Sequence, residues 1–144
     1  MLRARQTASI IGDVGMEALT ILPGFGVDDP ALGGFAQDID ELFNGLAYTP
    51  LRAYREANAP AMDWYGKRAW EELQGFLRAG TSDERVLVAA HAVLLPAALY
   101  PAVQDRPEMA EKLLDLNLNP AGGFGIMFHD GIATELIVEN DPLV

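Results

Sequence analysis

The chain has 144 residues, half of them hydrophobic and 22% charged, which is typical of one globular domain rather than of a disordered chain. Its formal net charge of −11 disfavours nucleic acid and anionic membranes as partners, because both repel an acidic surface. The lack of cysteine excludes disulfides and thiolate catalysis, and no apolar run resembles a secretory signal or a membrane span, so we expect a cytoplasmic protein.

Apolar side chains at near-helical spacing predict a first helix over residues 3–22. Gly12 and Gly15 weaken this prediction, because each costs about 1 kcal/mol relative to alanine inside a helix. The turn-forming run that begins at Pro23 ends the helix. A second, acidic amphipathic helix is predicted over residues 38–46, with its apolar side chains on one face.

Two further helices are predicted on either side of Pro60. Thr49 can cap a helix over residues 51–58, which ends as the chain approaches the proline. Residues 62–79 then show the clearest helical periodicity in the chain, and Gly80 ends that helix.

A short apolar run, VLVAA at residues 86–90, predicts a β-strand. Because the run is apolar throughout, it suits an inner strand of a parallel sheet that is covered on both faces. His91 follows directly. Ligands of open α/β sheets bind outside the carboxyl ends of the strands, so His91 is a candidate binding residue. A core histidine bonded to a carbonyl is the alternative, and the run alone does not separate the two.

The last part of the chain predicts two helices and a hairpin. The helices cover residues 95–100 and 107–116, each with a proline in its first turn. Strands over 124–128 and 132–138 flank the turn formed by residues 129–131, whose His-Asp-Gly sequence favours a β-hairpin. This order of elements suggests an α/β sandwich with an antiparallel edge.

Arg3 and Arg5 lie at the start of the first predicted helix, where the helix dipole already places positive partial charge. The placement becomes favourable when an anion binds there, because a guanidinium and backbone N–H groups then converge on one phosphate. Spacing alone favours the alternative of two solvated arginines at a frayed terminus. With two histidines, no HExxH spacing and no P-loop, we expect neither a metal nor a cofactor.

Three motifs follow one another along the chain: MLRARQTA at residues 1–8, VLVAAH at residues 86–91, and the stretch 119–140 with FHDG in its turn. Together they resemble the histidine phosphatase, or phosphoglycerate mutase-like, superfamily. The resemblance places the family's phosphate-gripping arginine at Arg3 and its second, phosphate-contacting histidine at His91. The third motif is similar to the family's closing hairpin.

The resemblance implies a three-layer α/β/α sandwich with a mostly parallel sheet and an antiparallel edge hairpin. It implies a phosphomonoesterase that works through phosphohistidine on a small phosphorylated molecule. It also implies a single domain over residues 1–144, within which residues 22–79 form a variable helical insert that selects the substrate.

The family's Arg-His-Gly motif, which supplies the nucleophile, does not occur in this sequence. The resemblance therefore implies an N-terminally incomplete, inactive domain that lacks the first strand and keeps Arg3 and His91 as half of a phosphate clamp. Glu41 precedes Gly45 by four residues, which is the spacing of the family's proton donor, so Glu41 is the candidate acid. A solvated helix carboxylate is the alternative for Glu41.

Without that first strand, the strand at 86–90 would present an open apolar edge, and such edges pair with other chains. We therefore expect a homodimer formed by strand exchange or edge pairing. Two alternatives stay open. One is a non-catalytic pseudo-enzyme that binds inorganic phosphate or only oligomerises; the other is an acidic, all-helical interaction protein in which residues 86–90 belong to a helix.

Overall fold

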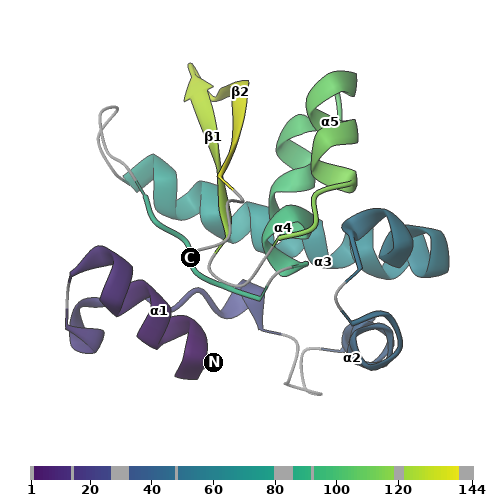
Figure 1. Ribbon diagram of the computed structural model, residues 1–144, viewed down its shortest axis with the longest axis horizontal. Helices are drawn as coiled ribbons and strands as arrows, with labels where there is room; N and C mark the ends of the chain where they lie inside the picture. Colours follow the sequence, from purple (N-terminus) through teal and green to yellow (C-terminus); the bar gives the residue numbers. More distant parts are fainter. Residues whose placement is uncertain are drawn as a thin grey trace.

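The computed structural model describes residues 2–13, 15–26, 33–47, 49–79, 86–91, 93–118 and 122–139. These residues form helices and one antiparallel hairpin, so the protein is mixed α and β (Figure 1). In chain order the elements are α1 (Leu2–Gly12), η1 (Met16–Ala18), η2 (Pro23–Phe25), α2 (Ala36–Leu46), α3 (Leu51–Ala79), α4 (Leu94–Val103), α5 (Pro107–Leu114), β1 (Gly123–His129) and β2 (Ile132–Glu139).

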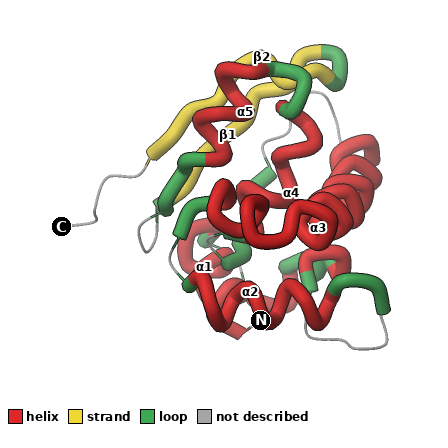
Figure 2. The backbone as a smooth tube through the Cα atoms, turned by 90° about the vertical axis from the view of Figure 1, so that its right-hand side faces the viewer, coloured by secondary structure: helices red, strands yellow, loops and turns green. Residues whose placement is uncertain are grey.

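The long helix α3 lies at the centre of the molecule. Figure 2 shows α4, α5 and the hairpin on one side of α3, with α1 and α2 on the other, and Figure 1 agrees. Contacts join α3 to α2, η2, α4 and α5. The segment 22–79, expected as a variable insert, therefore contributes the central helix of the core. Of the helices that the structure describes, none combines the length and apolar character that a membrane crossing requires.

A kink divides α3 where the sequence predicts two helices. Asn58 has a non-helical backbone conformation (φ −155°, ψ 80°), and Pro60 follows within the same continuous element. The Asn58 side chain accepts a hydrogen bond from the N–H of Ala61 at 3.1 Å, as the N-cap residue of a new helix does. A proline is tolerated beside that cap, because first-turn N–H groups have no helical acceptor. The predicted break between two helices is thus confirmed.

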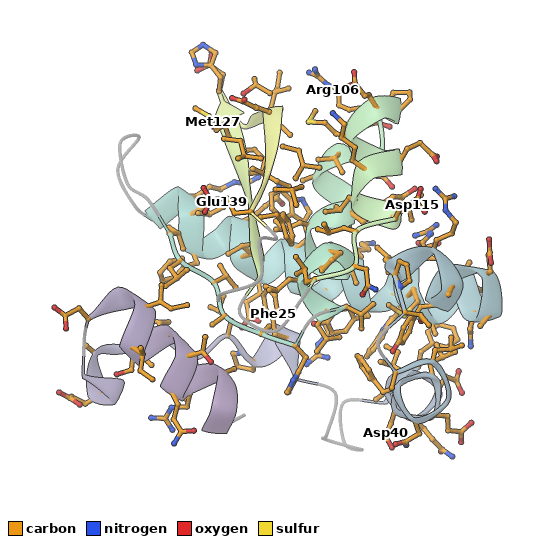
Figure 3. The ribbon with its side chains drawn as sticks, in the orientation of Figure 1. Phe25, Asp40, Arg106, Asp115, Met127 and Glu139 are labelled. Carbon is orange, nitrogen blue, oxygen red and sulfur yellow. The ribbon has the colours of Figure 1, made fainter. Side chains whose placement is uncertain are left out.

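Side chains of α3 hold the short turn η2 in place. Arg68 donates to the carbonyls of Gly26 and Pro23, each at 3.0 Å, and Glu72 accepts from the N–H of Gly24. These bonds satisfy backbone groups of a segment that has little regular structure of its own. Figure 3 shows Phe25, the last residue of η2, near the middle of the molecule.

The first helix is shorter than the sequence suggests. α1 ends at Gly12, and Asp13 has a positive φ of 50°, which a right-handed helix does not accommodate. The predicted continuation to residue 22 is wrong, because a separate 3-10 turn follows instead. Ile10 and Ile11 of α1 are 80% and 59% exposed, so the apolar side of this helix is largely uncovered.

Two groups of buried side chains form the core. The larger joins α2, α3 and α4, and its fully buried members include Ile39, Leu51, Tyr54 and Tyr65. The smaller joins α4, α5 and β2 through Val103, Leu113 and Ala133. Among the described residues, no buried side chain is polar or charged apart from the tyrosines.

Gly66 allows α3 and α4 to approach closely. A Cβ atom at this position would lie 2.6 Å from the carbonyl oxygen of Ala97 on α4. Pro101 lies four residues after Ala97 inside α4, and a proline has no N–H with which to bond that carbonyl. Gly66 thus packs against the Ala97 carbonyl, which receives no hydrogen bond from Pro101 one turn later in α4.

The C-terminal hairpin confirms the sequence prediction. β1 pairs with β2 in antiparallel fashion from Gly123↔Glu139 to His129↔Ile132, with a register irregularity between Met127 and Phe128. The two-residue turn is Asp130-Gly131, with φ values of 50° and 77°, as a type I′ turn requires. Trp70 of α3 stacks on Phe128 with 5.7 Å between ring centroids, which fixes the hairpin against the central helix.

The expected inner strand over residues 86–90 is not formed in this structure, because these residues belong to neither a helix nor a strand. The strands within the described part of the chain are the two of the hairpin, so the three-layer sandwich with a parallel sheet is not shown. The all-helical alternative is also wrong, because the hairpin is present and residues 86–90 are not helical.

Candidate functional site

His91 lies where the run 86–90 enters helix α4, and its side chain is exposed. Its carbonyl accepts hydrogen bonds from the N–H groups of Leu94 (2.9 Å) and Leu95 (3.3 Å), which fixes the residue at the start of the helix. The expectation of a histidine at the end of a buried strand is therefore corrected. His91 is a solvent-facing residue at a helix N-terminus.

The first turn of α4 has few free donors for an anion. Leu94 and Leu95 donate to His91, and Pro96 has no N–H. The N–H of Val93 has no acceptor among the described residues. An anion beside His91 would therefore meet the imidazole ring, this N–H and the positive end of the helix dipole.

The other two predicted site residues do not join His91 through any bond between described residues. The backbone of Arg3 lies in α1, and its side chain lies outside the described residues. Glu41 is exposed on α2, where it accepts a hydrogen bond from Gln37 one turn earlier at 3.1 Å. This is the arrangement of a solvated helix carboxylate, the alternative interpretation of Glu41.

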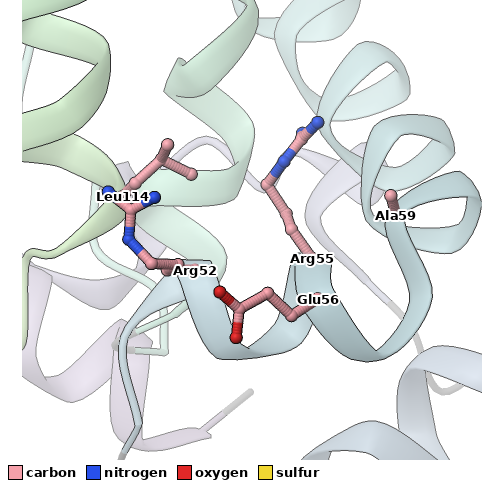
Figure 4. Close-up of a pocket in the computed structure, with 5 residues that line it drawn as sticks. All are labelled: Arg52, Arg55, Glu56, Ala59 and Leu114. Carbon is pink, nitrogen blue, oxygen red and sulfur yellow. The ribbon is translucent and has the colours of Figure 1, made fainter.

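A shallow hollow of about 230 Å³ lies between α3 and α5 (Figure 4). Its lining consists of Arg52, Arg55, Glu56, Ala59 and Leu114. Two arginines in one hollow suggest an anion site, but carboxylates already engage both. Arg52 bonds Asp115 at 2.5 Å and Glu111 at 2.6 Å, and Arg55 pairs with Asp63 while stacking over the Tyr100 ring at 4.4 Å.

These ion pairs decide the charge of the hollow. Hydrogen bonds to Asp115 and Glu111 raise the pKa of Arg52, and the bond from Arg52 lowers the pKa of Asp115. Arg52 therefore stays cationic and Asp115 anionic across the neutral range. The charge of Arg52 is balanced by two carboxylates, so the cluster connects α3 to α5 rather than attracting a phosphate.

A larger groove of about 460 Å³ lies between α5 and β2. Met109 and Leu136 provide its apolar part, and Arg106 and Lys112 contribute cations. Lys112 pairs with Glu108 at 3.0 Å along the same helix. In Figure 3, Arg106 and Asp115 mark opposite ends of α5, with Asp40 on the distant helix α2.

No cluster of three or more potential metal ligands occurs in the part of the chain that the structure describes. Sequence reasoning missed the Arg52 cluster, because Arg52 and Asp115 are 63 residues apart and no local pattern connects them. The pair Glu108 and Lys112 could have been found from its spacing of one helical turn.

Comparisons with protein-family models, with curated proteins and with solved structures found no match to this chain. Only the residues of this chain and its short motifs therefore bear on its function.

Proposed function

We propose that this chain is a phosphate-binding relative of the histidine phosphatases, with His91 as its principal phosphate contact and Arg3 as a second. The observation that carries the proposal is the place of His91: the exposed imidazole ends the VLVAA run at the first turn of α4. The RARQTA segment in α1 and the closing hairpin support it, since both occur in the order that the family has.

Phosphate binding depends on the groups near His91, because the chain as a whole is anionic and does not attract phosphate. An imidazole N–H donates charge-assisted hydrogen bonds to the anionic oxygens of phosphate, which are stronger than bonds between neutral groups. The Val93 N–H and the dipole of α4 add to this attraction. With so few contacts, we expect a dissociation constant on the order of millimolar for inorganic phosphate.

Phosphoester hydrolysis is not expected of this chain alone. The proposed reaction of the family needs an imidazole that attacks phosphorus and an acid for the leaving oxygen. The sequence has no Arg-His-Gly motif, and Glu41 bonds Gln37 on an exposed helix. His91 and Arg3 therefore act as binding groups in this proposal, and Glu41 has no assigned step.

The finer architecture belongs to the same proposal. In a three-layer sandwich, residues 86–90 form a strand, and a strand needs a hydrogen-bonded neighbour. Within the described residues the backbone of this run makes no hydrogen bond, so its N–H and C=O groups are available to such a neighbour, which supports that interpretation.

Equilibrium binding of inorganic phosphate, at constant ionic strength, tests the proposal. His91→Ala should abolish saturable binding, and His129→Ala is the matched control, because His129 is the second histidine and is 84% exposed in the hairpin turn. Since His91 is exposed, its truncation should leave the thermal unfolding midpoint nearly unchanged. Arg3→Ala should also weaken binding.

Equal phosphate binding by wild type and His91→Ala would refute the role of His91. Hydrolysis of p-nitrophenyl phosphate by the wild-type chain, abolished in His91→Ala, would refute the expectation that the chain lacks a nucleophile.

A further inference from the structure

The backbone of residues 86–90 has no hydrogen-bond partner among the residues that the structure describes. The run contains no polar or charged side chain. Val86 is 37% exposed and Leu87 is 54% exposed, whereas the next three residues are half-buried. Backbone N–H and C=O groups that are withdrawn from water are nearly always paired, so the half-buried residues 88–90 favour pairing with a further strand.

The run lies apart from the hairpin, which is the sheet that the described residues form. In Figure 1 the run is stretched out between α3 and α4, on the side of the molecule where α1 lies, and it takes no part in the hairpin. Helix α1 also carries exposed apolar side chains, Ile10 and Ile11. An incoming strand would bond the backbone of the run and lie beside its exposed side chains, Val86 and Leu87.

We propose that residues 86–90 pair with the same residues of a second copy of this chain, as antiparallel strands related by a two-fold axis at Val88. In this register Val86 lies opposite Ala90, and Leu87 lies opposite Ala89. This register brings every residue of the run opposite a residue of the partner. The N–H and C=O groups of alternate residues, Val88 among them, point toward the partner and bond across the two-fold axis. This inference does not depend on phosphate binding at His91.

The uncharged, apolar composition of the run favours a second copy as the occupant. The run is uncharged within a chain of net charge −11, so it offers no electrostatic attraction to a charged peptide. A second copy supplies an apolar run of the same length and side-chain size, and it brings no carboxylate opposite another within residues 86–90. Two-fold homodimers need one self-complementary patch, and this run is such a patch.

The net charge also gives the interface a recognisable salt dependence. Two chains of charge −11 repel each other at long range, whereas the paired residues carry no charge. Salt screens the repulsion and leaves the apolar contact intact. The dimer should therefore be more stable in 500 mM NaCl than in 20 mM NaCl, and the association is measured at both concentrations.

Sedimentation equilibrium of the full chain measures the association. We expect the mass to rise with concentration from the 15.6 kDa of one chain to twice that value, and to rise further with salt. Val88→Pro removes a donor at the centre of the pairing and should weaken the dimer by about tenfold or more. Thr20→Pro is the control, because Thr20 is exposed in a stretch without helix or strand and makes no described hydrogen bond.

Disulfide trapping tests the register, because the chain has no cysteine of its own. Val88→Cys would face its own copy across the two-fold axis, at a Cα separation of about 4.5–5.5 Å that a disulfide spans. Under mild oxidation this variant should form a covalent dimer much faster than Thr20→Cys. This measurement stands even where Val88→Pro fails to fold.

A strictly monomeric wild-type chain at all concentrations and salt levels would overturn the proposal. So would a dimer that Val88→Pro leaves unchanged, or equal rates of cross-linking for Val88→Cys and Thr20→Cys. Hydrogen exchange gives a further check on the unaltered protein: the amides of residues 86–90 should become protected as the chain dimerises, and unchanged exchange there would place the interface elsewhere.

Discussion

The contact between Gly66 and α4 gives the most quantitative prediction of the structure. Replacing Gly66 with alanine adds a Cβ atom 2.6 Å from the carbonyl oxygen of Ala97 and 3.5 Å from the Cγ atom of Pro101. The first distance is far below a normal van der Waals contact. The obstructing atom belongs to the backbone, so the two helices must separate to relieve it.

Two opposing terms set the expected change in stability. Alanine in place of a helical glycine stabilises by about 1 kcal/mol through backbone entropy. Overpacking a closed contact costs about 1–3 kcal/mol. Gly75→Ala is the matched control on the same helix, because a Cβ atom there meets nothing within 4 Å. Gly75→Ala should therefore gain about 1 kcal/mol, and Gly66→Ala should be less stable than this control by about 1–3 kcal/mol.

Urea unfolding, followed by far-ultraviolet circular dichroism, measures both variants against wild type. The helix gain is common to the two substitutions, so their difference isolates the clash. If Gly66→Ala proves as stable as Gly75→Ala, the close approach of α3 and α4 at this glycine is wrong.

Two further substitutions test the hairpin turn and the Arg52 cluster. Gly131→Ala should destabilise the fold by about 1 kcal/mol in urea unfolding, because φ is 77° at this position. Gly125→Ala in β1 is the control and should be nearly neutral, because a Cβ atom there meets nothing within 4 Å. Equal losses of stability in the two variants would contradict the turn geometry. Arg52→Met should lower the thermal unfolding midpoint at pH 7. The further fall of this midpoint on acidification should be smaller in the variant than in wild type. Because Arg52 lowers the pKa of Asp115, the stabilisation is present above the ordinary carboxyl pKa of about 4 and is lost as pH falls through the lower folded value. Lys112→Met, which breaks only an exposed pair within α5, is the control; identical pH profiles for the two variants would contradict the link between α3 and α5.

Local sequence signals predicted much of this fold. The Asp-Gly pair between two β-prone runs identified the hairpin, because few residues other than glycine accept a positive φ in so short a turn. Pro60 located the break in α3, because proline is disfavoured inside a helix. Asn58 caps the helix that begins after the break. In both cases the residue that decides the structure lies within the element it shapes.

The sequence was less informative where a structure depends on distant partners. Residues 86–90 have the composition of an inner strand, but a strand exists only when another row of backbone groups pairs with it. The cluster of Arg52 and Asp115 depends on the packing of α5 against α3, which no pattern within either helix reveals. Periodicity likewise extended α1 beyond Gly12, although the positive φ of Asp13 ends it.

The proposed role of His91 is tested most directly by a nuclear magnetic resonance titration of the wild-type chain with inorganic phosphate at fixed ionic strength. Saturable shifts at the His91 ring and the Val93 amide, with the His129 ring unaffected, are the predicted result. Shifts of equal size at both histidines, or at neither, would contradict a phosphate site at the start of α4.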